Sequence, residues 1–244
     1  MVTQCDPPIE SGIPTRLREL EAVRDAVQRV AAQGKREVSD VEALALDKTA
    51  PIVSRLDAIA VLTAMPQGRA EVPGGLFDSD DRALVVETLK CVRNARTAWA
   101  APEIVARVKS CHEPWKRAVL AWALAAYPKN TSAQTALLEV MARDPRQSVR
   151  DHAIESLGEF RSPVVLNALL RALEQGSASE RFWARYSLGT LADPQAREAV
   201  ARCLQDQTAI PDFGTVAGEA RRALEKINRK IRERPGRKAK RQGG

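Results

Sequence analysis

Aromatic side chains are scarce in this chain, since phenylalanine, tryptophan and tyrosine make up only 4% of its 244 residues. β-Sandwiches and β-barrels depend on aromatic and β-branched side chains, so the shortage argues against both. Alanine and leucine are abundant instead, which is typical of closely packed helices. No run of about eighteen apolar residues occurs, and the sequence therefore predicts no membrane-spanning helix.

Residues that carry chemistry are also few. The chain has two histidines, and its four cysteines lie far apart without CxxC spacing, at Cys5, Cys91, Cys111 and Cys203. This spacing predicts reduced thiols and neither a disulfide framework nor a metal site. No glycine-rich phosphate loop, nucleophile motif or paired-carboxylate pattern is present. The missing motifs lead us to expect no cofactor, no metal and no catalysis. The N-terminus lacks the basic start and apolar core of a signal peptide, so we expect a cytoplasmic protein.

The positive charge is confined to one end. The net charge is +7, yet the segment from Arg221 onward contains eleven Lys or Arg residues and only two acidic residues, Glu225 and Glu233. The preceding 220 residues carry 27 basic and 29 acidic groups. The excess of positive charge therefore lies on the last helix and the tail. It indicates that this end alone attracts an acidic polymer or a nucleic acid.

One helical sequence motif occurs in five copies, and the spacing of roughly 30 residues between copies is typical of stacked helix pairs. It consists of Arg, a small or apolar residue three positions on, and Leu seven positions on. The copies begin at Arg55, Arg82, Arg117, Arg150 and Arg181, and a degenerate sixth begins at Ala217. The pattern predicts an all-α fold, an α-solenoid of about five to six helical hairpins in a right-handed superhelix.

The same pattern sets the expected organisation. We expect a flexible N-terminus over 1–14, capping helices over 15–46, repeats over 47–232 and a basic flexible tail over 233–244. First helices are expected at about 101–111, 132–142, 163–174 and 194–205, and the last helix at about 215–232. Asp80 is the expected N-cap of the helix that carries Arg82.

The two best copies, Asp144–Gly158 and Ser177–Leu191, resemble HEAT repeats of the short subtype that phycobilisome lyase-like proteins also contain. The resemblance extends over about residues 47–228 and implies the solenoid fold. In such arrays the repeated Arg pairs with a turn Asp or with neighbouring carbonyls. The resemblance therefore implies a structural role for Arg55, Arg82, Arg117, Arg150 and Arg181, with Asp144 as the partner of Arg150.

Aromatic residues give the best signal for a binding surface. The positions one and five residues after each leading Arg are expected to share one open face of the second helix. This register places Trp122, Phe182 and Tyr186 on that face, with Arg185 nearby, and exposed aromatics are favoured contact anchors. The alternative is that irregular repeats bury them.

These observations predict a non-catalytic scaffold or adaptor, a monomer that binds a protein partner through its solenoid face. Its basic C-terminus adds electrostatic contacts through Arg229, Lys230, Arg232, Arg234, Arg237, Lys238, Lys240 and Arg241. Two alternatives stay open. One is a nucleic-acid-binding protein that acts through the basic C-terminus; the other is a lyase or DNA glycosylase of HEAT-like architecture that uses the groove.

Overall fold

The computed structural model describes residues 25–26, 28–29, 38–64, 74–95 and 99–233. Contacts between Cα atoms divide the chain into two compact units, Met1–Glu103 and Ile104–Gly244. Each unit is described by itself. The expected N-terminus over 1–14, most of the first capping helix and the tail from residue 234 onward lie outside the described residues.

The first unit contains three described α-helices and one 3-10 helix: α2 (Val38–Leu46), α3 (Ile52–Ala64), η1 (Gly74–Asp78) and α4 (Arg82–Ala95). Helix α2 packs on α3, and α3 packs on α4. The fully buried residues Ile59 and Leu84 lie on α3 and α4, and η1 adds the buried Phe77. Helix α5 (Ala100–Ser110) begins in this unit and continues into the second.

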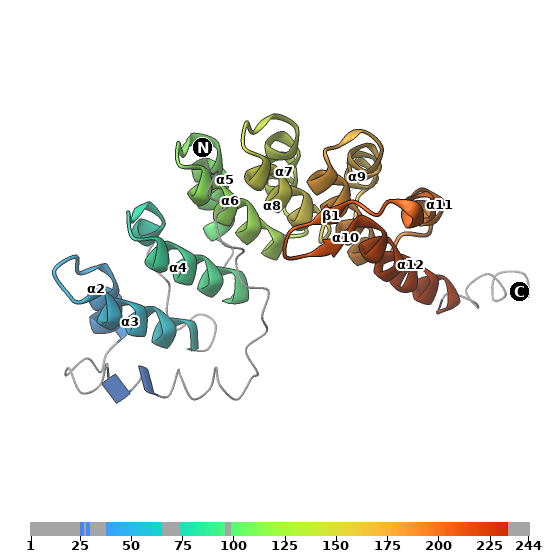
Figure 1. The fold of residues 1–244 in the computed structure, drawn as a ribbon. Coiled ribbons are helices and arrows are strands. Elements are labelled where there is room, and N and C mark those ends of the chain that lie inside the picture. The colour runs from blue at the N-terminus through green and yellow to red at the C-terminus, as the bar shows by residue number, and fades with distance from the viewer. Residues whose placement is uncertain (1–24, 27, 30–37, 65–73, 96–98, 234–244) are drawn as a thin grey trace, which may run out of the picture. The chain divides into compact units, whose positions relative to one another are not determined.

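The second unit arranges helices in two layers (Figure 1). The first-helix layer consists of α7 (Thr131–Arg143), α9 (Pro163–Gln175) and α11 (Arg197–Ala201). The second-helix layer consists of α6 (Pro114–Ala123), α8 (Gln147–Leu157), α10 (Ala178–Leu191) and α12 (Val216–Arg232). Short 3-10 segments extend α6 and α11: η2 (Leu124–Ala126), η3 (Pro194–Ala196) and η4 (Arg202–Gln205). Contacts run from α6 to α8, from α8 to α10 and from α10 to α12, so the second helices form one continuous row.

Local sequence signals explain where these helices begin. The side chains of Asn130, Ser162 and Thr215 accept hydrogen bonds from backbone amides in the first turns of α7, α9 and α12. Ser177 and Glu180 form a reciprocal capping box at the start of α10. In the first unit the cap of α4 is Asp81, whose Oδ1 accepts from the Leu84 amide at 3.1 Å. The prediction of Asp80 as the cap was therefore wrong by one residue.

Two glycines let neighbouring second helices approach closely. A Cβ on Gly158 would lie 3.0 Å from the Cα of Ser187, and a Cβ on Gly189 would lie 2.8 Å from the Cα of Ala223. Both glycines stand eight positions after the start of a repeat copy, and both contacts stand six positions after the start of the next. The equivalence shows that the degenerate copy at Ala217 has the same register as the others.

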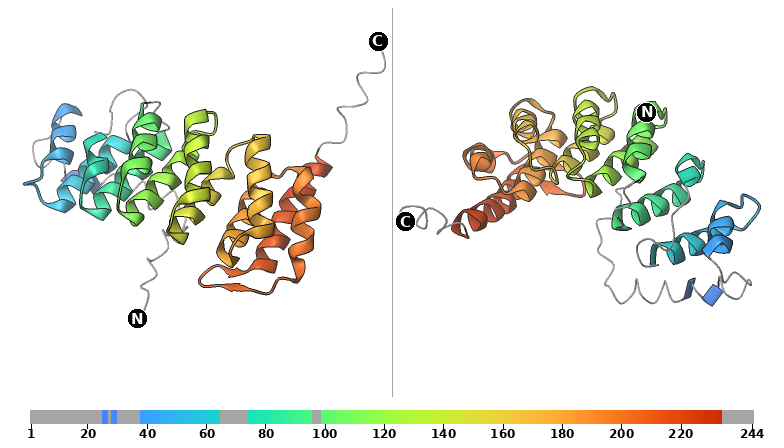
Figure 2. Two further views of the ribbon diagram at one scale, coloured as in Figure 1. Left: turned by 90° about the horizontal axis from the view of Figure 1, so that it is seen from above. Right: turned by 180° about the vertical axis from the view of Figure 1, so that it is seen from behind.

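A two-stranded antiparallel ladder interrupts the helical pattern between η4 and α12. Strand β1 (Ala209–Ile210) pairs with β2 (Gly214–Thr215), with Ala209 opposite Thr215. Asp212 in the turn and Gly214 at the start of β2 have positive φ. The hairpin lies against α10 and α12 (Figure 2). The stacked helical hairpins confirm the predicted all-α repeat fold, and this small ladder is the element that the sequence did not predict.

Candidate docking face on the second-helix layer

The repeated arginines form a ladder that links successive hairpins. Arg117 donates from Nε to Asp144 Oδ2 at 2.7 Å and from Nη2 to Oδ1 at 3.0 Å, and its Nη1 donates to the His112 carbonyl at 2.8 Å. The guanidinium group therefore holds its own preceding turn and the turn of the next hairpin together. Of this pair, Arg117 is 12% exposed and Asp144 6%.

The next two arginines repeat the arrangement. Arg150 donates to Glu180 Oε1 at 2.7 Å and to the Asp144 carbonyl at 2.8 Å. Arg181 donates to Asp206 Oδ2 at 3.3 Å and to the Gly176 carbonyl at 3.2 Å. In each case one partner is the carbonyl of the preceding turn, and the other is a carboxylate from the following hairpin.

The expected pairing of Arg150 with the Asp144 carboxylate was wrong. That carboxylate belongs to Arg117 of the preceding repeat, while Arg150 contacts the Asp144 backbone oxygen. At each step the arginine of one repeat donates to a carboxylate of the next hairpin; Arg117 binds both oxygens of its carboxylate, whereas Arg150 and Arg181 each bind one. In the first unit Arg55 likewise donates to a carbonyl, Ala45 O at 3.0 Å, while Arg82 is exposed at the start of α4.

These contacts shift the titration of the ladder carboxylates. Burial raises the pKa of Asp144, but the hydrogen bonds from Arg117 and from the Arg146 amide outweigh it and leave the pKa lowered. Burial opposed by Arg150 likewise leaves the pKa of Glu180 lowered. Asp151 behaves in the opposite way: its burial raises its pKa, although Ser179 and Gln147 both donate to it.

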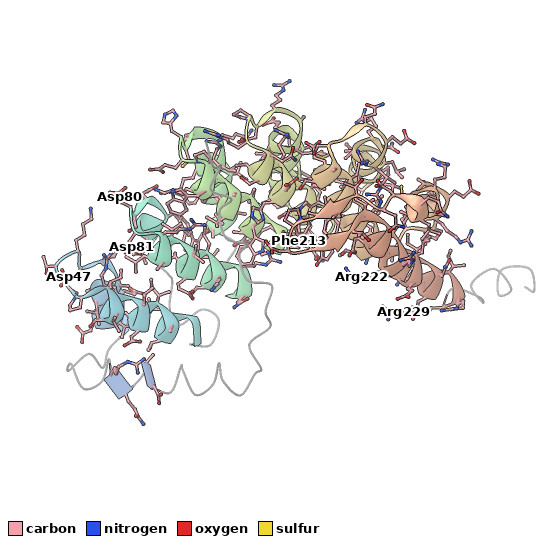
Figure 3. All side chains as sticks on the ribbon, in the orientation of Figure 1. Asp47, Asp80, Asp81, Phe213, Arg222 and Arg229 are labelled. Atoms are coloured by element: carbon pink, nitrogen blue, oxygen red, sulfur yellow. The ribbon has the colours of Figure 1, made fainter. Side chains whose placement is uncertain are left out.

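The aromatic residues of α10 form a cluster with the hairpin. The rings of Phe182 and Trp183 both contact Phe213 in the hairpin turn, with centroids 5.9 and 5.1 Å apart. Trp183 also contacts Tyr186 at 5.7 Å. Figure 3 labels Phe213 beside α10. Phe182 is only 3% exposed, so the expectation that it lies open was wrong, because the hairpin covers this part of α10.

Arg185 is also not at the surface. It is 1% exposed, and its Nη2 lies 3.6 Å from Asp206 Oδ2. Its Nε and Nη1 atoms have no hydrogen-bond partner among the described residues. The equivalent residues of the two preceding copies are Ala121 and Ile154, both fully buried. Arg185 therefore places a charge at an apolar core position, and the expectation of an exposed contact residue was wrong for it.

Four residues at the fifth position of successive copies remain accessible, and we call them the position-five row. They are Trp122 on α6, Glu155 on α8, Tyr186 on α10 and Arg222 on α12. Trp122 and Tyr186 are half-buried, the Glu155 side chain is 23% exposed and the Arg222 side chain 61%. Because their helices contact one another in order, the row crosses the second-helix layer. Its chemistry alternates: aromatic, acidic, aromatic, basic.

Side chains next to the position-five row add further charged groups to it. Lys226 Nζ lies 5.2 Å from the centre of the Tyr186 ring, a cation–π contact that joins α12 to α10. His152 Nδ1 lies 3.4 Å from Glu155 Oε2. Figure 3 labels Arg222 and Arg229 along α12, and Arg229 is 71% exposed. The basic end of the row is therefore a strip along α12.

The fifth position of the repeat copies predicted Trp122 and Tyr186 as contact residues and also holds Glu155, but Arg222 was missed. The signal was present, since Arg222 stands five positions after Ala217 just as Tyr186 stands five after Arg181. Of the predicted basic residues, Arg229, Lys230 and Arg232 lie in the last turns of α12. Arg234, Arg237, Lys238, Lys240 and Arg241 lie outside the described residues.

Within the described part of the chain, no three His, Cys, Asp or Glu side chains are grouped so that they could hold a metal ion. His112 is exposed, and His152 contacts Glu155. None of the described helices has the length and apolar character needed to cross a membrane.

Comparison with known proteins identifies the repeat. A family model described as HEAT repeats matches residues 101–189, which confirms the predicted HEAT-like repeats there. A comparison with curated proteins found no match.

Several solved structures are similar over most of their length. The complex of CpcE and CpcF of phycocyanin lyase from Nostoc is 16% identical, with a TM-score of 0.47, over 93% of this chain and 98% of that chain. A designed armadillo repeat protein in complex with the peptide (KR)4 is also 16% identical, with a TM-score of 0.47, over 86% and 98%. Human deoxyhypusine hydroxylase is 20% identical, with a TM-score of 0.34, over 91% and 94%.

Proposed function

We propose that the chain is a non-catalytic scaffold that binds a protein partner, a function supported by its match to a family model described as HEAT repeats over residues 101–189. The binding surface is the open face of the second-helix layer. The observation that carries this proposal is the position-five row, in which two half-buried aromatics alternate with an acidic and a basic side chain on adjacent helices. Aromatic and Arg side chains are the residue types that anchor protein interfaces.

The partial burial of Trp122 and Tyr186 supports a role in partner binding. A half-buried aromatic on a rigid helix is already held by its neighbours, so it loses little conformational freedom on binding. The mix of charges around it favours a polypeptide partner, whose residues can match both signs. Phe182 and Arg185 contribute by packing beneath this surface and not by direct contact, since both are buried.

Site-specific photo-crosslinking in cells that express the protein tests the proposal. A photoreactive phenylalanine analogue replaces Trp122 or Tyr186, and a matched control carries it at Val164, which is 56% exposed on α9. We expect one and the same protein adduct at positions 122 and 186 and its absence at 164. Equal adducts at all three positions, or no protein adduct at 122 and 186, would contradict the proposal.

A nucleic-acid-binding function is the second candidate, and one observation favours it. Helix α12 carries six basic residues against Glu219 and Glu225, and Glu219 is buried beside Arg222. Phosphate contacts through such a helix depend steeply on salt. Fluorescence anisotropy with labelled DNA and RNA, at low and near-physiological salt, compares the full chain with a version that ends at Arg232. Tight binding at the higher salt that survives truncation would favour nucleic acid over the protein partner.

The lyase or glycosylase alternative requires a groove that holds a chromophore or an alkylated base. Assays of chromophore transfer and of alkylated-base release with the purified chain address it directly. Turnover that is abolished by the substitutions Trp122→Ala and Tyr186→Ala, with folding retained, would replace the scaffold proposal by an enzymatic one.

A further inference from the structure

The position-five row presents one side chain per repeat at a regular interval. Packed helices lie about 8–10 Å apart, and α6, α8, α10 and α12 contact each other in sequence. The members of the row therefore stand about 9 Å apart, one for each second helix. The register is fixed by the equivalent contacts of Gly158 with Ser187 and of Gly189 with Ala223.

One backbone conformation matches this interval. A polyproline II helix has three residues per turn and rises about 3.1 Å per residue, so every third side chain points the same way at about 9 Å intervals. A β-strand alternates its side chains with a period of two, and a residue three positions on would point away. An extended peptide in the polyproline II conformation can therefore place one side chain on each member of the row.

The charges of the row decide what those side chains are. Trp122 and Tyr186 offer apolar contact, and Glu155 offers a carboxylate that lies 3.4 Å from His152 Nδ1. Arg222 donates to the buried Glu219 at 2.8 Å and keeps its side chain 61% exposed, with Lys226 one turn further along. A polyanion would meet repulsion at Glu155 two helices away from Arg222, whereas a peptide can reverse its sign within six residues.

We propose that this face binds a linear peptide in the polyproline II conformation with the period-three pattern apolar–x–x–basic–x–x–apolar–x–x–acidic. The apolar residues contact Trp122 and Tyr186, the basic residue pairs with Glu155, and the acidic residue lies between Arg222 and Lys226. The inference rests on the proposed scaffold function and names the chemistry of its partner segment.

The hairpin sets one border of the peptide site. Phe213 covers Phe182 and Trp183, which stand one and two positions after Arg181. The peptide therefore crosses α10 at Tyr186, beyond the hairpin, and the equivalent earlier positions of α10 are closed to it. The row at position five is the accessible path over this helix.

The experiment measures binding of fluorescein-labelled synthetic peptides to the full chain by anisotropy. The test peptide has leucine at both apolar positions, lysine, glutamate, and proline or serine at each x. Because the chain direction is open, the pattern is synthesised in both orders. The control peptides have the same composition with lysine and glutamate exchanged, or with the spacing shortened to two. We expect one order of the test peptide to bind at least tenfold more tightly than every control peptide.

Charge reversal then locates the peptide. Glu155→Lys is expected to weaken the test peptide at least tenfold and to restore binding when the peptide lysine becomes glutamate. Arg222→Gln, which can still donate to Glu219, is expected to weaken the test peptide but not a peptide whose glutamate is replaced by glutamine. Arg221→Gln on the same helix is the matched control and leaves affinity unchanged.

Equal affinity for the test and exchanged peptides, or no compensation by charge reversal, would overturn the inference. So would a complete lack of binding of both peptide orders to the wild-type chain. The melting temperatures of Glu155→Lys and Arg222→Gln, compared with wild type, show that a missing compensation does not come from unfolding. Photo-crosslinking at Trp122 and Tyr186 separates this failure from that of the scaffold proposal: a protein adduct there, together with peptide indifference, retains the function and rejects the peptide pattern.

Discussion

Arg117 and Asp144 form a bidentate ion pair between two consecutive hairpins, at 2.7 and 3.0 Å, although 27 positions separate them in the chain. The pair is largely removed from water, and Arg117 also holds the carbonyls of Cys111 and His112. Three carboxylates occupy comparable places in the second unit, and each accepts from the arginine of the preceding repeat. The solenoid is therefore held together by polar links at its turns as well as by its apolar core.

We predict that Asp144→Asn lowers the free energy of unfolding by about 2 kcal/mol, the typical contribution of hydrogen bonds to a charged group. Asparagine fills the same volume but leaves the guanidinium without a counter-charge. Urea denaturation followed by circular dichroism measures the change. Glu139→Gln is the control, because the Lys109–Glu139 pair has the same type of contact with both side chains about half exposed. Equal loss in the two variants would show that burial of the Arg117 pair adds nothing.

The pH dependence of stability follows from the same pairs. Since the folded state lowers the pKa of Asp144, the pair stabilises the fold fully above the unfolded pKa of about 3.9, and this contribution disappears as pH falls through the folded value. We expect the gap in unfolding free energy between wild type and Asp144→Asn to be constant from pH 7 to about 5 and to shrink below pH 4. A gap that persists undiminished at pH 2 would contradict the assigned cause.

Asp151→Asn should behave in the opposite way. Burial raises the pKa of Asp151, so its ionised form is unfavourable in the fold, and stability rises as pH falls through the folded pKa toward the unfolded one. Asparagine removes the charge and can still accept from Gln147 Nε2, which now lies 2.8 Å from the carboxylate. We expect the melting temperature of Asp151→Asn at pH 7 to equal or exceed that of wild type. A clear loss of stability at pH 7 would show that the ionised carboxylate is needed by Ser179.

The close approach of α10 and α12 leads to a further prediction. In Gly189→Ala the new Cβ would meet the Ala223 Cα at 2.8 Å, and this contact involves backbone that cannot rotate away. Overpacking of this kind costs about 1–3 kcal/mol, which exceeds the roughly 1 kcal/mol that alanine gains over glycine in a helix. We expect a lower melting temperature. Ala192→Gly at the end of the same helix is the matched opposite, because Ala192 has φ of 50° and glycine relieves that strain.

The sequence predicted several helices closely because a capping side chain marks where they begin, whereas the first helix expected over 194–205 is a short α11 (Arg197–Ala201) between the 3-10 segments η3 and η4. Asn130, Ser162 and Thr215 cap their helices, and the expected first helix over 163–174 is observed at Pro163–Gln175. Local chemistry sets these boundaries, so local reasoning finds them. The tertiary partners were harder to find: nothing in the spacing shows that Asp144 reaches back to Arg117, since Arg150 is nearer in the chain.

The candidate site was predicted only in part for a related reason. Trp122 and Tyr186 are accessible because helical periodicity places them on the open side. Phe182 shares that side but is covered by Phe213, which the chain brings back over α10 through a hairpin of only two paired residues per strand. Such a short ladder has no periodic signal. Burial at a single position therefore depended on an element that sequence patterns do not reveal.

Arg185 provides the final prediction. Its guanidinium group is 1% exposed, and two of its three nitrogens have no acceptor among the described residues. The third lies 3.6 Å from Asp206, which is also held by Arg181 and by the Thr208 amide. A buried charge with such incomplete partners is costly, and Asp206 keeps Arg181 as its partner when Arg185 is replaced, so the substitution leaves no carboxylate without a counter-charge. We therefore expect Arg185→Met to keep or raise the free energy of unfolding.

Arg181→Met, which removes the ladder contact to Asp206, is the control and should lower the free energy of unfolding. A loss of stability in Arg185→Met as large as in the control would mean that an acceptor completes the Arg185 site in solution, and a bound anion would then be sought by adding inorganic phosphate or sulfate during the melt.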